Sequence, residues 1–524
     1  MTCMSNEVER VRSIFGRRRK KVEQPKQEHF SKLLESNLDE NLKNLKNMLD
    51  HPKDLIVREL LIGDGNQRCA VVYMEGIVDA QSIHTNILAK LQLENETYPT
   101  EPSILIDYLY TKKIAINNVK RSDSFDDVSL SLLTGQTALY VDGIAEVLLI
   151  ESAGGEFRRI EEPVTETLIR GPREGFTENL SYNLAILRRN IADPNLRFQT
   201  YKTGRRSKKN LVVAYIDGIV HPNIVKEVNR RLKSIDIDDV PDTGYIEEWI
   251  EDSFLSPFPQ MLNTERPDKI IAALVQGKVG ILLDGTPFVL ILPISFGNVL
   301  QSPEDYYERW TIGSLLRILR YLGAFISIFL PSLYIALISF HPGMIPSDLA
   351  FSIAASREGV PFSSVIEAIL MVITLELLQE AGARLPRTIG QTIGIVGGLV
   401  IGEAAVQAGI VSPIMVIVVA LTAIGTFAIP YYSVAISFRI IRFAFIFAAA
   451  ILGLYGVILV YIAINIHFVN LKSFGIPYSV PFAPFIAADW NDLLIRMPIP
   501  TITNRPRNLQ TEDVNLVNTR RKGK

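Results

Sequence analysis

The chain has 524 residues, of which 48% are apolar and 21% are charged, and its formal net charge is −2. This length exceeds what one hydrophobic core serves, so we expect two or three domains. The balanced charge argues against nucleic-acid binding, and two cysteines, Cys3 and Cys69, exclude a disulfide framework and a multi-cysteine metal site. The first 50 residues are polar, and no apolar stretch follows the basic run at residues 17–21. We therefore interpret them as a disordered N-terminal segment rather than a signal peptide.

The region after this segment contains an internal repeat. Residues 71–78, with the sequence VVYMEGIV, recur 142 positions later as VAYIDGIV at residues 213–220. Each is a run of β-branched and aromatic residues that ends at an acidic residue followed by glycine, and a helical pattern comes next. The two runs predict equivalent strands, with Gly76 and Gly218 in equivalent turns.

A second pair of turns lies at the same separation. Asp142-Gly143 and Asp284-Gly285 each follow a short helix and a strand, and each precedes a returning apolar strand. Asp-Gly between apolar runs is a strong hairpin signal because glycine accepts a positive φ. We therefore predict an α/β soluble region of two related subdomains. The predicted domains are subdomain 1 (residues 51–170), a helical linker (171–209) and subdomain 2 (210–300).

The soluble region contains no recognisable catalytic constellation. No glycine-rich phosphate loop follows either strand, and the six histidines are isolated, without the spacing of zinc ligands. We therefore predict no enzymatic activity, no bound metal and no cofactor. The most distinctive segment is GPREGFTE at residues 171–178. Arg173 and Glu174 are candidates for a contact between subdomains or between subunits, while a purely structural loop is the favoured interpretation.

Residues 301–488 are predicted to form an all-α transmembrane domain. Several long stretches contain no acidic or basic side chain, and each is long enough to cross the bilayer. We expect four to six spans, with the soluble region on the cytoplasmic side because arginines precede the first span. The expected spans are residues 318–340, 363–380, 388–408, 413–429 and 443–466.

The pattern leaves open the side on which the chain ends. Arg439 and Arg442 are expected to mark a cytoplasmic connection before the last span. Five spans from a cytoplasmic start would put the C-terminus outside, whereas the basic excess at residues 489–524 favours a cytoplasmic tail. Either one segment does not cross, or the proline-rich residues 476–488 form a re-entrant piece. Within the second expected span, Glu367 and Glu376 are intramembrane carboxylates if that segment crosses.

The expected span at residues 388–408 carries the clearest functional pattern. Glycine recurs every fourth position, which lets a neighbouring helix approach closely, and the predicted packing residues are Gly390, Gly394, Gly398 and Gly402. The opposite face is polar at one end and apolar in its middle, and it comprises Thr392, Val396, Leu399, Glu403 and Gln407. This layout is typical of a pore-lining helix with a hydrophobic constriction. The equal alternative is a helix buried in a bundle, with Glu403 hydrogen-bonded to a neighbour.

Collinear motifs over most of the chain resemble the A-subunit family of bacterial spore germinant receptors. They are GPREGFTENL at 171–180, RPD at 266–268, DGTPF at 284–288, SPEDYY at 302–307, EAG at 380–382, GQTIG at 390–394 continuing through VSP at 411–413, and SVPFAP at 479–484. The resemblance implies a subunit of a nutrient receptor in the spore inner membrane that triggers germination. It also implies a transporter-like B subunit and a lipoprotein C subunit as partners, assembly into a homo-oligomeric ring, and release of monovalent cations when nutrient binds.

Two other functions are compatible with the same pattern. A secondary transporter subunit would use Glu367 and Glu403 as ion ligands. It should also show a repeat in its hydrophobic region, whereas the repeat here lies in the soluble region. A non-conducting scaffold would use the glycine-rich helix for packing alone. Our leading hypothesis is an oligomeric, nutrient-gated cation channel subunit embedded in membrane lipid.

Overall fold

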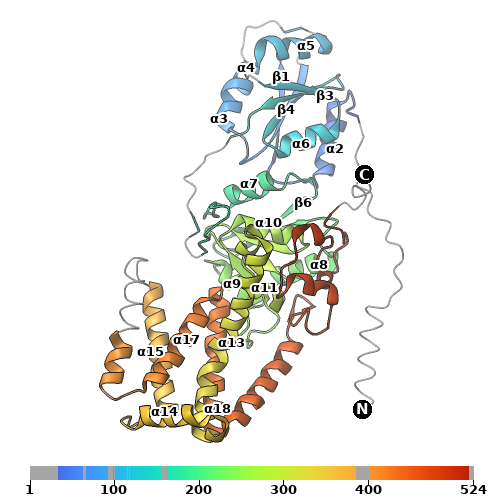
Figure 1. The fold of residues 1–524 in the computed structure, drawn as a ribbon. Coiled ribbons are helices and arrows are strands. Elements are labelled where there is room, and N and C mark those ends of the chain that lie inside the picture. The colour runs from blue at the N-terminus through green and yellow to red at the C-terminus, as the bar shows by residue number, and fades with distance from the viewer. Residues whose placement is uncertain are drawn as a thin grey trace. The chain divides into compact units, whose positions relative to one another are not determined.

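The chain folds into two compact units (Figure 1). The computed structural model describes residues 33–62, 67–92, 98–99, 101–114, 116, 118–154, 162–163, 166–384 and 400–517. Unit 1 comprises Met1–Arg158, Leu184–Arg197 and Ile216–Ile219, and unit 2 comprises Arg159–Asn183, Phe198–Tyr215 and Val220–Lys524.

Unit 1 is built on a five-stranded antiparallel sheet with the strand order β1-β2-β4-β5-β3. Its strands are β1 (Leu55–Ile62), β2 (Gln67–Met74), β3 (Val119–Ser122), β4 (Gln136–Val141) and β5 (Val147–Glu151). Its helices are α2 (Leu38–Met48), α3 (Ala80–Ile83), η1 (His84–Leu88), α4 (Ala89–Leu91), α5 (Pro102–Tyr108), η2 (Leu109–Lys113) and α6 (Phe125–Leu133). Apolar side chains of α2 and α6, among them Leu45 and Leu132, are fully buried in the same core as the central strands. This core makes unit 1 a layered α/β structure.

The second sheet has the strand order β6-β7-β9-β10-β8. Its strands are β6 (Leu196–Thr203), β7 (Lys209–Ile216), β8 (Leu262–Thr264), β9 (Val279–Leu283) and β10 (Val289–Leu292). The helices near it in the sequence are α7 (Leu180–Asn190), α8 (Pro222–Leu232), α9 (Thr243–Ile250), α10 (Pro267–Val275), α11 (Phe296–Val299) and α12 (Glu304–Tyr307). Its core includes Val213, Val228 and Ile281, which have no exposed surface.

The two sheets confirm the predicted fold class. Their strand orders are equivalent, and in each sheet a helix precedes the third strand of the order. Gly76 (φ 86°) and Gly218 (φ 75°) both follow the second strand of their sheets, and Gly143 (φ 90°) and Gly285 (φ 94°) both occupy the turn between the third and fourth. These positive φ values explain why glycine recurs at the four turns.

Strand β6 lies within residues 171–209, for which the sequence predicts a helical linker. Only α7 in this stretch is a helix, and β6 is the edge strand of the second sheet. Its sequence, LRFQTYKT, mixes polar with apolar residues because an edge strand has one unpaired side. The strand therefore lacks the continuous apolar run by which its neighbours were recognised.

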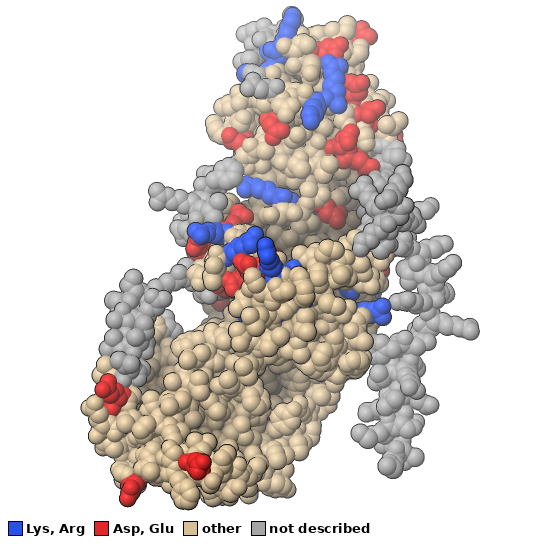
Figure 2. Space-filling model, in the orientation of Figure 1, with Lys and Arg blue, Asp and Glu red and all other residues tan. Residues whose placement is uncertain are grey.

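The C-terminal half of unit 2 is helical. Its helices are α13 (Trp310–Phe340), η3 (Pro342–Met344), α14 (Ser347–Arg357), α15 (Ser364–Arg384), α17 (Pro413–Phe427) and α18 (Tyr432–Asn470), and residues 400–407 are also helical. Within the described part of the chain, α13 and α18 are long and apolar enough to cross a membrane, and α17 is a shorter apolar helix. On the face in Figure 2, few charged side chains lie over this helical part. The number of spans stays a prediction.

Helix α18 is a hairpin of two arms rather than one straight helix. At Gly453 the backbone leaves the helical region (φ 59°, ψ −139°), and the chain turns back. The ring of Phe329 on α13 lies 4.7 Å from the ring of Phe445 and 6.0 Å from that of Tyr461. In a straight helix those two residues would be roughly 24 Å apart. The expectation of one uninterrupted span at residues 443–466 is therefore wrong, because a single glycine in an uncharged run does not signal a reversal.

The segment after α18 packs onto the second sheet. It contains β11 (Lys472–Ser473), β12 (Ile476–Pro477), η4 (Ala487–Asp492), η5 (Ile499–Thr501) and η6 (Arg507–Leu509). The Ser473 hydroxyl donates to the carbonyl of Gln260 at 2.7 Å, and the Arg505 guanidinium donates to the carbonyl of Val275 at 2.8 Å. Up to residue 517, the segment predicted as a basic cytoplasmic tail is thus part of the folded unit, because its buried arginines Arg496 and Arg505 donate to backbone carbonyls.

Candidate functional site

One guanidinium joins four helices in the apolar half of unit 2. Arg442 of α18 is fully buried and donates to the carbonyl of Ser327 on α13 and to the hydroxyl of Thr426 on α17, both at 2.6 Å. It also pairs at 3.1 Å with Glu376 on α15, which Arg439 approaches at 3.4 Å. The two arginines predicted to mark a cytoplasmic connection therefore lie inside a helix, where they neutralise a carboxylate.

Glu367, the other predicted intramembrane acid, is also neutralised within the chain. Its side chain has no exposed surface, accepts a hydrogen bond from the backbone N–H of Ser412 and lies 3.5 Å from the guanidinium of Arg357 on α14. The Ser412 hydroxyl in turn accepts from the N–H of Met415 at 3.3 Å and caps α17. Glu367 thus links the ends of two helices.

The predicted pore face is described only at its C-terminal end. Gly390, Gly394, Gly398, Thr392, Val396 and Leu399 lie outside the described residues. Gly402 is buried, and a Cβ added to it would lie 3.3 Å from Val416 on α17. Glu403 and Gln407 are exposed, and the Gln407 amide donates to the Glu403 carboxylate at 3.2 Å. At this end, the glycine side of the helix is packed and the carboxylate side is open.

The GPREGFTE segment packs against α10 and the residues before it. The carbonyl of Pro172 accepts from the Arg266 guanidinium at 2.7 Å, and the N–H of Phe176 donates to the carbonyl of Glu265 at 2.8 Å. Arg173 pairs with Glu162 at 2.9 Å, and its side chain is 74% exposed. Glu174 is half-buried. These contacts lie within unit 2, and the predicted role of Arg173 and Glu174 in a subdomain or subunit contact stays a prediction.

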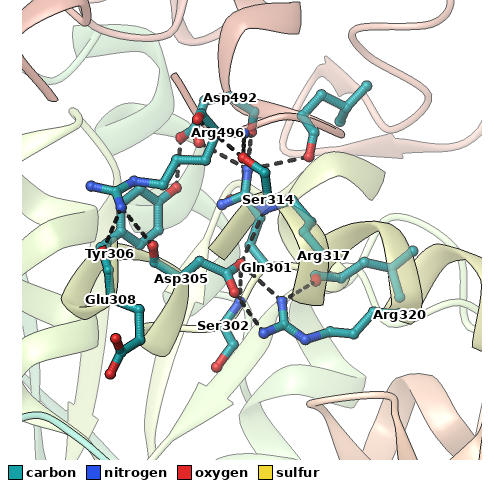
Figure 3. Close-up of polar contacts among 12 residues, drawn as sticks. Gln301, Ser302, Asp305, Tyr306, Glu308, Ser314, Arg317, Arg320, Asp492 and Arg496 are labelled. Atoms are coloured by element: carbon teal, nitrogen blue, oxygen red, sulfur yellow. Dashed lines mark hydrogen bonds and ion pairs between the residues drawn. The ribbon is translucent and has the colours of Figure 1, made fainter. Parts of the chain in front are cut away.

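A charged cluster lies where α13 begins, and we call it the junction network (Figure 3). Its centre is Asp305 of α12, which has no exposed surface. The Asp305 carboxylate accepts from the Arg317 guanidinium at 3.0 Å and from the two Nη atoms of Arg320 at 2.8 and 2.6 Å. These arginines, which the sequence presents as topology markers ahead of the span, are instead the buried partners of one carboxylate.

The C-terminal segment completes the junction network. Arg317 Nη1 donates to the carboxylate of Asp492 at 2.9 Å, and the Tyr306 hydroxyl donates to the same carboxylate at 2.6 Å (Figure 3). Arg496 donates to the backbone carbonyl of Asp305 at 2.8 Å. A bidentate arrangement around a fully buried carboxylate is geometrically specific, so α12, α13 and the C-terminal segment must move as one body or break charge pairs. Sequence analysis missed this network because its members are as many as 191 positions apart.

Two further contacts tie helix ends to α10. The Tyr307 hydroxyl donates to the Asp268 carboxylate at 2.5 Å, and burial together with this hydrogen bond raises the pKa of Tyr307. Lys269 pairs with Glu166 at 2.9 Å, and its ammonium lies 4.0 Å from the ring centroid of Tyr431, the residue before α18. Charged side chains of α10 therefore contact residues that lie just before each of the two long apolar helices.

A chain of hydrogen bonds runs from the second sheet to the junction network. Lys278, at the start of β9, donates to the side-chain oxygen of Asn298 at 2.9 Å, and Asn298 donates to Gln301 at 3.3 Å. Gln301 then donates to the carbonyl of Asp492 at 2.7 Å. Burial lowers the pKa of Lys278 to about 8, because its ammonium has a neutral amide as partner in place of water.

Replacing Lys278 by methionine is expected to stabilise the protein at neutral pH and to have less effect at alkaline pH. An unfolded lysine has a pKa of about 10.4, so between pH 8 and that value the unfolded chain holds the extra proton. Stability of the parent protein therefore rises with pH across this window, and the methionine variant lacks that rise. The expected gain at pH 7 is up to about 3 kcal/mol.

Denaturant unfolding in detergent at pH 7 to 10 measures this gain in stability, with Lys269→Met as the control. The Lys269→Met change should destabilise the protein, because it leaves the carboxylate of Glu166 without its ion-pair partner. If the difference in unfolding free energy between the Lys278→Met variant and the parent protein stays constant with pH, the explanation is wrong.

These features define the class of protein. Within unit 2, an α/β sheet is joined through buried charged groups to two helices that are long and apolar enough to cross a membrane, and these helices support a membrane association. The family model of the Bacillus/Clostridium GerA spore germination protein matches residues 43–508. The chain therefore belongs to the GerA family of spore germination proteins, and the resemblance found in the sequence is confirmed.

Individual relatives cover nearly the whole chain. Spore germination protein GerLA of Bacillus cereus is 49% identical over 480 residues, which are 92% of this chain and 97% of that protein. Spore germination protein KA of Bacillus subtilis (strain 168) is 44% identical over 482 residues, or 92% and 88% of the two chains. A crystal structure of the N-terminal domain of the A subunit of the Bacillus megaterium spore germinant receptor GerK3 matches with 36% identity and a TM-score of 0.39. That match covers 50% of this chain and 98% of that one.

Proposed function

We propose that this protein is the A subunit of a germinant receptor in the spore inner membrane, where it helps to trigger germination when nutrient is sensed. Membership of the GerA family and the names of its relatives support this role. In the proposed complex it works with a transporter-like B subunit and a lipoprotein C subunit. Its soluble region lies on the spore-core side of the membrane, and it has no enzymatic activity.

In this proposal the protein forms a homo-oligomeric, nutrient-gated cation channel of four to six spans per subunit. The pore is lined by Thr392, Val396, Leu399, Glu403 and Gln407. The observation that carries it is the contrast among three acids of the expected spans, Glu367, Glu376 and Glu403. Glu367 and Glu376 are matched by arginines of the same chain, whereas Glu403 is exposed on a helix surface. A carboxylate in that position needs water or a neighbouring subunit, and a water-filled central pore supplies both.

The junction network is the proposed link between sensing and opening. Because Asp305, Arg317 and Asp492 are locked together, a displacement of the second sheet is passed to α13. Helix α13 contacts both arms of α18, so the displacement reaches the bundle that supports the pore helix. A rigid joint of this kind suits two-state gating better than a flexible linker does.

Reconstitution of the receptor into planar bilayers tests the proposal. The purified protein, alone or with its B and C subunits and nutrient, is expected to carry currents selective for monovalent cations. The Gly394→Leu and Gly398→Leu variants serve as controls, because bulky side chains at the packing ridge should prevent assembly and abolish the current. Intact assembly with no current under any condition would favour the non-conducting scaffold instead.

A further inference from the structure

The end of α18 is held against a loop of the second sheet. The Ser256 hydroxyl and His467 Nε2 lie 2.9 Å apart, and the ring of Phe258 lies 6.2 Å from that of His467. Phe258 also contacts Phe468 with ring centroids 5.5 Å apart. The loop after α9, residues 251–261, therefore lies at the level where the second arm of α18 returns to the soluble part of unit 2.

Aromatic rings extend this contact into α11 and the C-terminal segment. Phe468 lies 5.0 Å from Phe296, which lies 6.2 Å from Phe482. Trp490 follows at 5.2 Å from Phe482, and Phe485 lies 5.7 Å from Trp490. Aromatic side chains gather in this way where a membrane protein passes from hydrocarbon to water.

Large apolar side chains beside this aromatic cluster are exposed. Phe254 is 78% exposed, Leu255 is 82% exposed and Phe485 is 70% exposed. Two consecutive large side chains held this far out of a folded unit mark an interaction site. The second arm of α18, which the same loop contacts through Ser256 and Phe258, also has exposed apolar residues, since Ile466 and Val469 are 59% and 52% exposed. Exposed apolar side chains therefore occur both on the loop and on the helix arm that it contacts.

A small polar cavity adjoins the loop. It has a volume of about 230 Å³ and is lined by Glu251, Ser256, Pro257, Phe258, Pro259, Ser433, Ile436 and Ser437. Its polar lining groups are Glu251 and Ser256 on the loop side and Ser433 and Ser437 in the first turns of α18. Polar groups of this kind suit the hydrated headgroup layer, just as the neighbouring Phe254 and Leu255 suit the layer of acyl chains beneath it.

We propose that Phe254, Leu255 and Phe485 insert into the boundary between headgroups and acyl chains of the bilayer, so that the second sheet rests on the membrane surface. Lipid is the occupant because the patch lies on a loop that is joined by hydrogen-bond and ring contacts to the end of an apolar helix arm whose own apolar side chains are exposed. The soluble part of unit 2 then has two attachments to the membrane, the junction network at α13 and this loop at the end of α18. The loop fixes the height of the sheet above the bilayer.

Fluorescence quenching in lipid nanodiscs tests the insertion. Phe254→Cys and Leu255→Cys are made separately in the full chain carrying Cys3→Ser and labelled with bimane, while the buried Cys69 stays unlabelled. Phe447→Cys on the first arm of α18, where the native side chain is 54% exposed, is the lipid-facing reference. Arg206→Cys is the aqueous reference, because it lies in an exposed, basic turn with a side chain 84% exposed.

Lipids carrying a nitroxide near the headgroup are expected to quench both loop labels strongly, while the Arg206 label is quenched mainly by iodide in solution. Labels at Phe254 and Leu255 that respond to iodide as the Arg206 label does would overturn the proposal. In the complete receptor, loop labels shielded from both quenchers would also overturn it, in favour of a protein partner. The two positions are independent, so one misfolded variant leaves the test intact.

Discussion

Replacing Glu403 by glutamine is expected to weaken the cation selectivity of the reconstituted receptor while leaving its assembly intact. The side chain is exposed, and its hydrogen bond from Gln407 needs only an acceptor oxygen, which glutamine also has. In a symmetric ring the change removes a circle of negative charge that attracts cations. Measuring the reversal potential and the amount of assembled complex in the same preparation checks both parts of the expectation.

The matched control for this change is Glu376→Gln. Glu376 pairs with Arg442, which is fully buried, so its neutralisation leaves a buried guanidinium without a countercharge and should lower the amount of folded protein. Loss of the complex in Glu403→Gln as well would support a buried, structural Glu403. Normal assembly with unaltered selectivity would move the pore to another helix, with α15 as the next candidate.

At the proposed constriction, Val396→Ala should admit water and allow germination without nutrient.

Replacing Asp305 by asparagine is expected to destabilise the protein by about 3–5 kcal/mol, the usual cost of removing one partner from a buried ion pair. Two guanidinium groups meet this carboxylate, and it has no exposed surface, so water cannot compensate for the lost charge. Arg317 keeps Asp492 as a partner, whereas Arg320 keeps the backbone carbonyl of Leu300 at 3.3 Å, which carries no countercharge. The free energy of unfolding in detergent, measured by denaturant titration, gives the magnitude.

An exposed ion pair of the same type separates charge burial from charge pairing. Asp107 lies 2.5 Å from Arg121, but its side chain is 63% exposed, so Asp107→Asn should cost less than about 1 kcal/mol. Equal losses of unfolding free energy from the two substitutions would show that burial does not determine how much Asp305 contributes to stability. A negligible loss from Asp305→Asn would show that the junction network does not hold α12 and α13 together.

Features encoded by local sequence could be predicted. The duplicated fold followed from acid-glycine turns, because a positive φ at Gly143 and Gly285 restricts the residue type at the turn itself. Strand β6 could not be predicted in this way, because an edge strand has one unpaired side and its residues carry a mixed pattern. The hairpin at Gly453 could not be predicted either, because the residues on both sides of the turn are apolar. A reversal within such a run has the same sequence pattern as a continuing helix.

The buried charged residues show more clearly which contacts the sequence could not predict. Arg317, Arg320 and Arg442 have the composition and position of residues that flank membrane helices, and from sequence they indicate the side of the membrane. Their actual partners, Asp305, Asp492 and Glu376, lie on other helices or in the C-terminal segment, at separations that no local pattern encodes. Glu403 and Gln407 could be placed on one face in advance, because a spacing of four residues is enough for that.

The reversal at Gly453 has a practical consequence for experiments on this protein. The second arm of α18 leads back to the second sheet, and the residues after it pack against that sheet. The C-terminal segment is therefore an integral part of the folded unit. A reporter fused after residue 517 would sit in the same compartment as that sheet. A stop codon soon after Asn470 would remove Asp492 and Arg496, the partners of Arg317 and of the Asp305 carbonyl, so a truncation made to remove a tail would also remove part of the junction network.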